Sequence, residues 1–320
     1  MRLALIFNKT RADTIGIYFE RACRSLGIPY DHWWLRDAAR IPREYDLYLR
    51  IDHGDDYTVA LPDHLRPQVF YAIDTHLRHS WRKIQKEATR YDAVFCCHRE
   101  AIFHLPRAEW LPVACDPSLI EPVIPEGHGF DVAFIGTDGG TPRKFILQAL
   151  RERYTQSLIG KAPHTQIMTI YRQAKIGFNY SIRGELNMRL FEVLGAGALL
   201  VTNAPRHPEE LALLGLDSGV HLVIYHRPLE IFECIDAWLS QEQEEERLRI
   251  AHRGMTLAHE RHTYVHRLQS LLQVATERLG VRGTRESPHN TLTSVASGKT
   301  LRVPTPFLHG LRVVASGCEE

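Results

Sequence analysis

The chain has 320 residues, of which 39 are Lys or Arg and 38 are Asp or Glu, so its net charge is +1 with neutral histidines. This balance excludes a long-range electrostatic pull toward nucleic acid or an anionic membrane, and any anion binding must come from a local site. The length predicts two domains, each with enough chain for a hydrophobic core.

Apolar runs and cysteine spacing indicate the cellular setting. No apolar run approaches the roughly 20 residues needed to cross a bilayer, and the apolar stretch in residues 1–8 is too short for a secretory signal. The six cysteines show no Cys-x-x-Cys pair and no zinc-like spacing, which is typical of small core residues in a reduced compartment. The 18 histidines are scattered, without a His-Glu-x-x-His motif. We therefore expect a cytoplasmic protein with no metal and no other bound cofactor.

The first part of the chain alternates strand-like and helix-like segments. Strands are predicted at residues 3–7, 45–51, 67–73 and 91–97, and helices at residues 14–26 and 79–90. Such alternation is typical of a parallel, doubly wound α/β sheet.

A second alternation follows a proline-rich interval, which places a linker near residues 117–129. Strands are predicted at residues 130–135, 175–180, 199–202 and 221–225. Helices are predicted at residues 142–154, 228–239, 242–259 and 264–279. Residues 283–320 mix Ser, Thr, Gly, Pro and His without periodicity, which predicts a mobile tail.

The most informative segment runs from Leu186 to residue 203. Three leucines recur every four residues, which predicts a helix with one apolar face; they are Leu186, Leu190 and Leu194. Arg189 and Glu192, three residues apart, lie close together on a different face. One interpretation pairs these two charges on a solvated surface. The other leaves Glu192 free for a ligand.

Glycines and an apolar run follow this helix. We expect Gly195 and Gly197 to end it, because glycine tolerates the left-handed geometry of a C-terminal cap. Residues 199–201 form the next strand, and Thr202 and Asn203 leave polar groups at its carboxyl end. In open α/β sheets this end binds ligands.

A glycine-rich turn precedes the predicted helix at residues 142–154. Gly136 and Thr137 begin the turn, and Arg143 and Lys144 follow it. Small residues let backbone N–H groups approach a phosphate, and a helix N-terminus adds partial positive charge. The turn by itself also fits an ordinary strand-to-helix connection.

Polar residues follow two strands of the first part. Asp74 and His76 come after one strand, and the acidic run at residues 52–56 comes after another. A histidine at such a position is suited to proton transfer, because its unperturbed pKa lies near neutrality. Turn capping is the alternative role for the aspartates.

These segments together resemble GT-B glycosyltransferases. Residues 187–192 match the pattern Asn-x-Arg-x-Phe-Glu, followed by Gly and an apolar strand, of the CgeB-like (spore-maturation) branch of the group 1 glycosyltransferases. The resemblance implies that Glu192 holds the ribose hydroxyls of a nucleotide-sugar, and that the loop 136–144 faces its diphosphate. It also implies catalytic or acceptor-side roles for Asp74 and His76. The implied donor-side residues are Gly136, Thr137, Arg143, Lys144, Asn179, Arg183, Asn187, Arg189 and Glu192.

One position departs from the related retaining enzymes, which place a second glutamate eight residues earlier, near the transferred sugar. That position here is Gly184, and the nearest acid is Glu185. Near the C-terminus, residues 260–267 are similar to the family's terminal His-Thr-Tyr…Arg segment. We interpret His262, Tyr264 and Arg267 as structural anchors there.

The resemblance predicts two Rossmann-like domains. Residues 1–122, completed by a helix at 264–280, would bind the acceptor, and residues 123–263 would bind the nucleotide-sugar. The expected activity is transfer of a hexose-type sugar from a nucleoside diphosphate-sugar, such as a UDP-sugar, to a glycan, protein or small molecule. No nucleic acid partner is expected. Two alternatives stay open, a non-catalytic nucleotide- or partner-binding module and a nucleotide-sugar epimerase.

Overall fold

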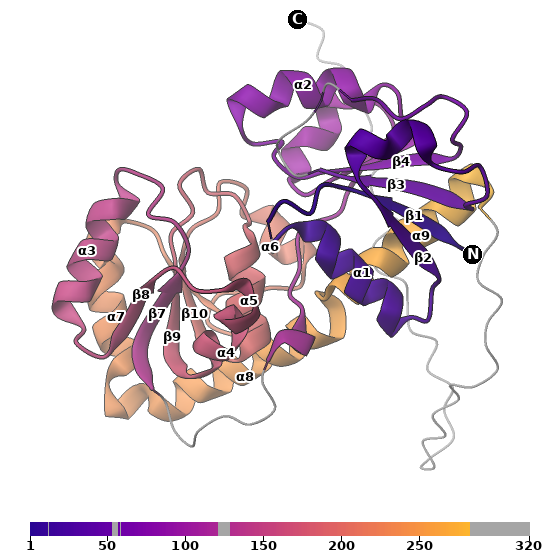
Figure 1. Cartoon of the computed structure of the whole chain (residues 1–320). Helices are drawn as coiled ribbons and strands as arrows, with labels where there is room; N and C mark the ends of the chain where they lie inside the picture. The colour runs from indigo at the N-terminus through magenta and orange to yellow at the C-terminus, as the bar shows by residue number, and fades with distance from the viewer. Residues whose placement is uncertain (12, 53–56, 58, 121–128, 282–320) are drawn as a thin grey trace, which may run out of the picture. The chain divides into compact units, whose positions relative to one another are not determined.

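The computed structural model describes residues 1–281 except 12, 53–56, 58 and 121–128 (Figure 1). Most of the acidic run at 52–56, most of the predicted linker and the predicted tail therefore lie outside the described residues. The predicted domain boundary falls in the same gap.

The first sheet has six strands, all parallel, in the order β2-β1-β3-β4-β5-β6. They are β1 (Leu3–Ile6), β2 (Tyr30–Trp33), β3 (Leu47–Ile51), β4 (Gln68–Ala72), β5 (Ala93–Cys96) and β6 (Ala108–Trp110). The helical segments between them are α1 (Ile15–Ser25), η1 (Leu35–Arg40), α2 (Arg78–Ala88) and η2 (Arg99–His104). The central strands are buried along their whole length, as expected for a parallel sheet covered on both faces.

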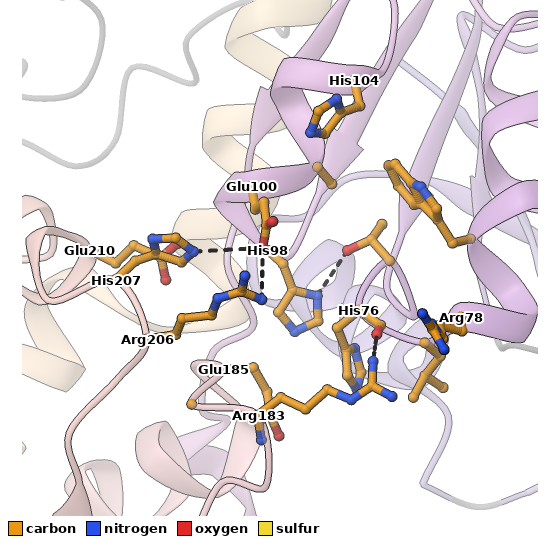
Figure 2. Close-up of a pocket in the computed structure, with 15 residues that line it drawn as sticks. His76, Arg78, His98, Glu100, His104, Arg183, Glu185, Arg206, His207 and Glu210 are labelled. Carbon is orange, nitrogen blue, oxygen red and sulfur yellow. Dashed lines mark hydrogen bonds and ion pairs between the residues drawn. The ribbon is translucent and has the colours of Figure 1, made fainter. Parts of the chain in front are cut away.

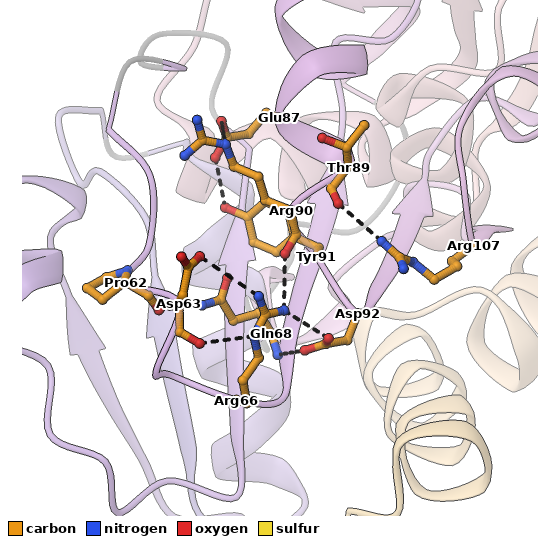
Figure 3. Close-up of polar contacts among 10 residues, drawn as sticks. All are labelled: Pro62, Asp63, Arg66, Gln68, Glu87, Thr89, Arg90, Tyr91, Asp92 and Arg107. Carbon is orange, nitrogen blue, oxygen red and sulfur yellow. Dashed lines mark hydrogen bonds and ion pairs between the residues drawn. The ribbon is translucent and has the colours of Figure 1, made fainter.

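Polar contacts tie together the amino ends of β4 and β5 (Figure 3). The Arg66 guanidinium donates to the Arg90 carbonyl at 3.1 Å and to Asp92 at 2.8 Å. The other carboxylate oxygen of Asp92 accepts the Gln68 backbone N–H at 2.7 Å. These contacts join the amino ends of the two strands, opposite the edge of the sheet where the strands have their carboxyl ends.

The second sheet has five parallel strands in the order β11-β10-β9-β7-β8. They are β7 (Phe130–Ile135), β8 (Ser157–Gly160), β9 (Ala174–Asn179), β10 (Leu199–Asn203) and β11 (Val223–Tyr225). The α-helices of this half are α3 (Arg143–Arg153), α4 (Ile167–Arg172), α5 (Met188–Ala196), α6 (Glu209–Leu213), α7 (Ile231–Leu239) and α8 (Glu244–Arg261). Short 3₁₀ segments are η3 (Pro117–Leu119), η4 (His164–Gln166), η5 (Pro228–Glu230) and η6 (Gln241–Gln243).

The expected end of α5 is partly wrong. Gly197 alone ends the helix, with a left-handed φ of 87°. Gly195 lies inside α5, where an added Cβ would come 2.7 Å from the Cys115 sulfur. Close packing, not helix termination, therefore requires glycine at position 195.

The last helix, α9 (Tyr264–Leu279), packs against α1. Tyr264 stacks on Tyr18 with ring centroids 4.7 Å apart. The buried Arg267 guanidinium donates to two carbonyls of residues 112–113 at 2.7 and 3.2 Å, and contacts the His262 ring at 3.2 Å. These contacts confirm the anchoring role expected for the three residues. In the described part of the chain, every helix is too short or too polar to span a bilayer.

Candidate active site

The strand β7 ends at a loop in which glycine is required at two positions. Gly136 has φ 151°, and an added Cβ would lie 2.2 Å from an Arg189 nitrogen. Gly139 has φ 62°, and its Cβ would lie 2.0 Å from an Arg143 nitrogen. The two guanidinium groups therefore pass directly against the loop backbone.

Arg143 and Arg189 converge on one aromatic ring. Their guanidinium carbons lie 5.8 and 3.9 Å from the centre of the Phe134 ring. Arg143 is 8% exposed and donates to the carbonyls of Asp138 at 3.0 Å and Tyr180 at 3.2 Å. Burial and then the charge of Arg189 lower the pKa of Arg143. Neither arginine has a carboxylate partner within ion-pair distance among the described residues. Two cations without a counter-ion make this loop suited to an anion.

Two asparagines orient Arg189. The side chain of Asn187 accepts the Leu190 N–H at 3.3 Å and so caps the N-terminus of α5. Asn179 is buried, and its side-chain oxygen accepts from Arg189 at 2.9 Å and from Asn187 at 3.2 Å. Arg189 also donates to the Ile135 carbonyl at 2.9 Å. The predicted donor-side residues Asn179, Asn187 and Arg189 thus form one network.

Glu192 is buried in α5 without a hydrogen-bond partner among the described residues. It is 8% exposed, and Arg189 uses its N–H groups elsewhere. Burial raises the pKa of Glu192 to about 7. The positive charge of Arg189 opposes this shift, and the negative charge of Asp13 adds to it. The solvated charge pair considered from sequence does not form. The carboxylate is available to accept hydrogen bonds from a ligand.

A cavity of about 270 Å³ lies next to the loop that joins β9 to α5 (Figure 2). Its walls come from the segments after β4, β5, β9 and β10. All four segments belong to one compact part of the chain, Met1–Gly283. The residues that line it include His76, Trp81, Glu100, Arg183, His207 and Glu210. The carboxyl ends of four strands thus supply one cavity, as is usual for open parallel sheets.

The loop before α5 forms one wall. The Arg183 guanidinium donates to the His76 carbonyl. Glu185 accepts from the backbone N–H of Arg183 at 2.9 Å and from the Ser181 hydroxyl at 3.1 Å. Gly184 has φ 71°, and an added Cβ would lie 2.6 Å from the Arg206 backbone nitrogen. A glutamate at position 184 would therefore be strained, while Glu185 lines the cavity.

His76 brings an unsatisfied nitrogen to the cavity. Its Nδ1 is buried without a hydrogen-bond partner, and burial lowers its pKa. Its ring lies 4.5 Å from that of His98, which contacts the Thr75 hydroxyl at 2.9 Å. A neutral imidazole of this kind can accept a proton.

Asp52 supports the turn that carries His76. One carboxylate oxygen accepts the backbone N–H groups of Ile73 at 3.1 Å and Asp74 at 3.3 Å, and the other accepts the Tyr57 hydroxyl at 2.7 Å. Asp74 itself is half-buried and does not line the cavity. The structure therefore brings His76, but not Asp74, to the cavity wall.

Two other predicted residues contribute less to the cluster. Thr137 and Lys144 are exposed at the glycine-rich loop. Lys144 uses its backbone N–H to bond the Gly140 carbonyl at 2.9 Å. Their side chains lie at the edge of the site.

Sequence reasoning missed several cavity residues. His98 and Glu100 follow β5, and Arg206 and His207 follow β10. The rule that selected Asp74 and His76, a polar residue after a strand, would have found them. Glu210 gave no such signal, because it lies in α6, which was not predicted.

Comparisons with known proteins point to one fold. Residues 118–273 match a family profile described as "Glycosyl transferase-like". No curated protein sequence matches the chain significantly. Anabaena HepE (Alr3699), solved in complex with UDP-glucose, is similar with a TM-score of 0.63 at 11% identity, over 86% of this chain and 99% of that one.

Two further solved structures are similar over their whole length. Sucrose-phosphate synthase from Thermosynechococcus elongatus has a TM-score of 0.60 at 11% identity, covering 88% of this chain and 100% of that one. An α-glucosyltransferase in complex with UDP-glucose and DNA containing an abasic site has a TM-score of 0.59 at 10% identity, covering 86% and 99%. With its two parallel sheets and these structural relatives, the chain has the GT-B fold, and about half of it matches a glycosyl transferase-like family.

Proposed function

We propose that the protein is a glycosyltransferase that moves a sugar from a nucleoside diphosphate-sugar to an acceptor hydroxyl. The observation that carries this proposal is the pair of arginines, Arg143 and Arg189, held against a glycine loop without a carboxylate partner among the described residues. The family match and the UDP-sugar complexes of the structural relatives support the same reading. The Asn-x-Arg-x-Phe-Glu pattern at residues 187–192 supports the CgeB-like branch.

On this proposal the diphosphate lies at the loop after β7. Arg143 and Arg189 neutralise its charge, and they stabilise it further as it leaves with the electrons of the broken sugar–phosphate bond. No metal is needed for this role, because both cations already face the leaving group.

On this proposal the ribose binds Glu192, which lies on α5 together with Arg189. An ionised carboxylate accepts two hydroxyl hydrogen bonds, and charge-assisted bonds are the stronger kind. Binding therefore stabilises the ionised form of Glu192 and increases with pH up to about its pKa of 7.

The transferred sugar and the acceptor meet in the cavity. The acceptor oxygen forms the new bond to the anomeric carbon, and its proton passes to a base. His76 Nδ1 is our candidate for this base, because it is buried and without a hydrogen-bond partner. Asp74 is half-buried and follows the same strand as His76. We keep it as a second candidate for a catalytic or acceptor-side role.

The test is a thermal-shift and turnover screen with UDP, GDP, thymidine diphosphate and UDP-glucose. A ligand at about 100 times its dissociation constant stabilises by about 2.7 kcal/mol. We expect one diphosphate to stabilise the wild type but not Glu192→Ala, with Glu277→Ala on the exposed face of α9 as the control.

The outcomes separate the alternatives. Release of nucleoside diphosphate from the nucleotide-sugar together with a glycosylated product supports transfer. Binding without turnover supports a non-catalytic module, and release of an altered free sugar supports an epimerase. No shift with any nucleotide would refute the proposed donor site.

A further inference from the structure

Three polar residues that line the cavity have side-chain groups without a hydrogen-bond partner among the described residues. His76 Nδ1 and His207 Nε2 are both buried without a hydrogen-bond partner, and the nearest carboxylate to His207 Nε2, that of Glu100, lies 3.6 Å away, beyond hydrogen-bond distance. Glu210 is 7% exposed as a residue, and its carboxylate has no hydrogen bond or ion pair with any other described residue. Buried polar groups are normally satisfied, so these three indicate a ligand with both hydrogen-bond donors and acceptors.

The charges around the cavity cancel. The lining residues with formal charges are Arg78, Arg183, Arg206, Glu100, Glu185 and Glu210, all labelled in Figure 2. Glu100 lies 3.6 Å from both Arg206 and His207. A phosphorylated or acidic acceptor would be favoured by an excess of cations. The wall of this cavity has no excess of arginines over glutamates, which favours an uncharged ligand.

One side of the cavity is apolar. Trp81, Leu77 and Ala101 line it, and the indole meets the His104 ring edge-on, with centroids 6.2 Å apart. A flat apolar surface beside groups that bind hydroxyls fits a sugar ring, which has C–H faces and a hydroxyl rim. A cavity of about 270 Å³ is at the small end of ligand sites. A long lipid chain would therefore not be enclosed.

We propose that the acceptor is an uncharged carbohydrate, whose ring packs on Trp81 and whose hydroxyls bind His207 and Glu210. The inference rests on the proposed glycosyltransferase function, in which this cavity lies beside the transferred sugar. Glu210 and Trp81 then determine acceptor specificity without taking part in donor binding.

The test measures saccharide binding to the full chain by saturation-transfer NMR, with and without saturating UDP. The probes are methyl glucoside, methyl galactoside, methyl mannoside and cellobiose, compared with glucose 6-phosphate and glucuronic acid. We expect at least one neutral probe to bind and neither anion to bind better. Trp81→Ala should weaken neutral binding about tenfold, and Glu210→Gln should weaken it with little effect on folding. Trp34→Ala, a half-buried tryptophan outside the cavity wall, is the matched control.

Donor binding separates this inference from the proposed function. UDP affinity should be unchanged in Trp81→Ala and Glu210→Gln. Preferred binding of the anionic probes, or no saccharide binding to a protein that binds UDP, would overturn the acceptor class and leave the donor site standing. If no nucleotide binds, neutral saccharide binding that depends on Trp81 still supports a carbohydrate site, and its absence refutes one.

Discussion

The substitution Glu192→Gln should stabilise the protein at alkaline pH while it weakens the donor site. The carboxyl group is buried without a hydrogen-bond partner in the described part of the chain, and its pKa is raised from 4.5 to about 7. The folded protein thus holds the proton more tightly than the unfolded chain does. Wild-type stability therefore falls as the pH rises from 4.5 to 7, and it is level above that range.

The size of the effect follows from the same values. A pKa raised from 4.5 to about 7 corresponds to about 3 kcal/mol lost once Glu192 is ionised in both states. The glutamine amide is neutral but keeps a cost of about 1–3 kcal/mol as an unsatisfied polar group. We expect Glu192→Gln to be about 0–2 kcal/mol more stable than the wild type at pH 8, which raises Tm by up to about 6 °C. Because the wild type regains about 3 kcal/mol as the pH falls to 4.5, the variant should there be the less stable of the two by about 1–3 kcal/mol.

The assay is thermal unfolding of wild type and Glu192→Gln across pH 4.5–8, with Glu277→Gln as an exposed control on α9. The same series with a saturating nucleoside diphosphate should show protection of the wild type and about 10- to 100-fold weaker binding to the variant. A Tm difference that does not change with pH would refute the reasoning, because it would mean that Glu192 ionises as it does in the unfolded chain.

Three further outcomes follow from the site. Arg143→Ala should weaken nucleoside diphosphate binding about 10- to 100-fold by calorimetry, whereas Lys144→Ala at the exposed edge should change it less than about threefold; equal losses would contradict the specific role of Arg143. Gly184→Ala should lower stability by about 1–3 kcal/mol in denaturant unfolding, because its φ of 71° and the nearby Arg206 nitrogen leave no room for a Cβ; an unchanged midpoint would disprove that strain. Removal of divalent cations with EDTA should leave sugar transfer unchanged, and a loss restored by Mg²⁺ would show that the arginines do not suffice.

Most of the buried strands can be predicted from local sequence patterns. The apolar runs at β1, β3, β4, β5, β7, β9 and β10 predict strands because a strand buried on both faces reads as a continuous hydrophobic segment. The helix α5 and its cap at Gly197 also follow from local periodicity and backbone geometry. The edge strands β2, β6 and β8 were missed, because they are short and half-buried: β2 and β6 include charged or polar side chains, and β8 has only two apolar residues between Ser157 and Gly160.

The surroundings of the candidate site residues, in contrast, depend on the tertiary structure. The sequence left Glu192 paired with Arg189 or free, and only the fold shows Arg189 turned toward Asn179 and Glu192 buried alone. Asp52, which the sequence shows only as part of an acidic run after a strand, accepts the backbone N–H groups of the turn before His76. The cavity joins segments that follow four different strands, and Glu210 reaches it from a helix without a sequence signal. Local patterns fix elements because their causes lie within a few residues, whereas the environment of a carboxylate depends on groups far away along the chain.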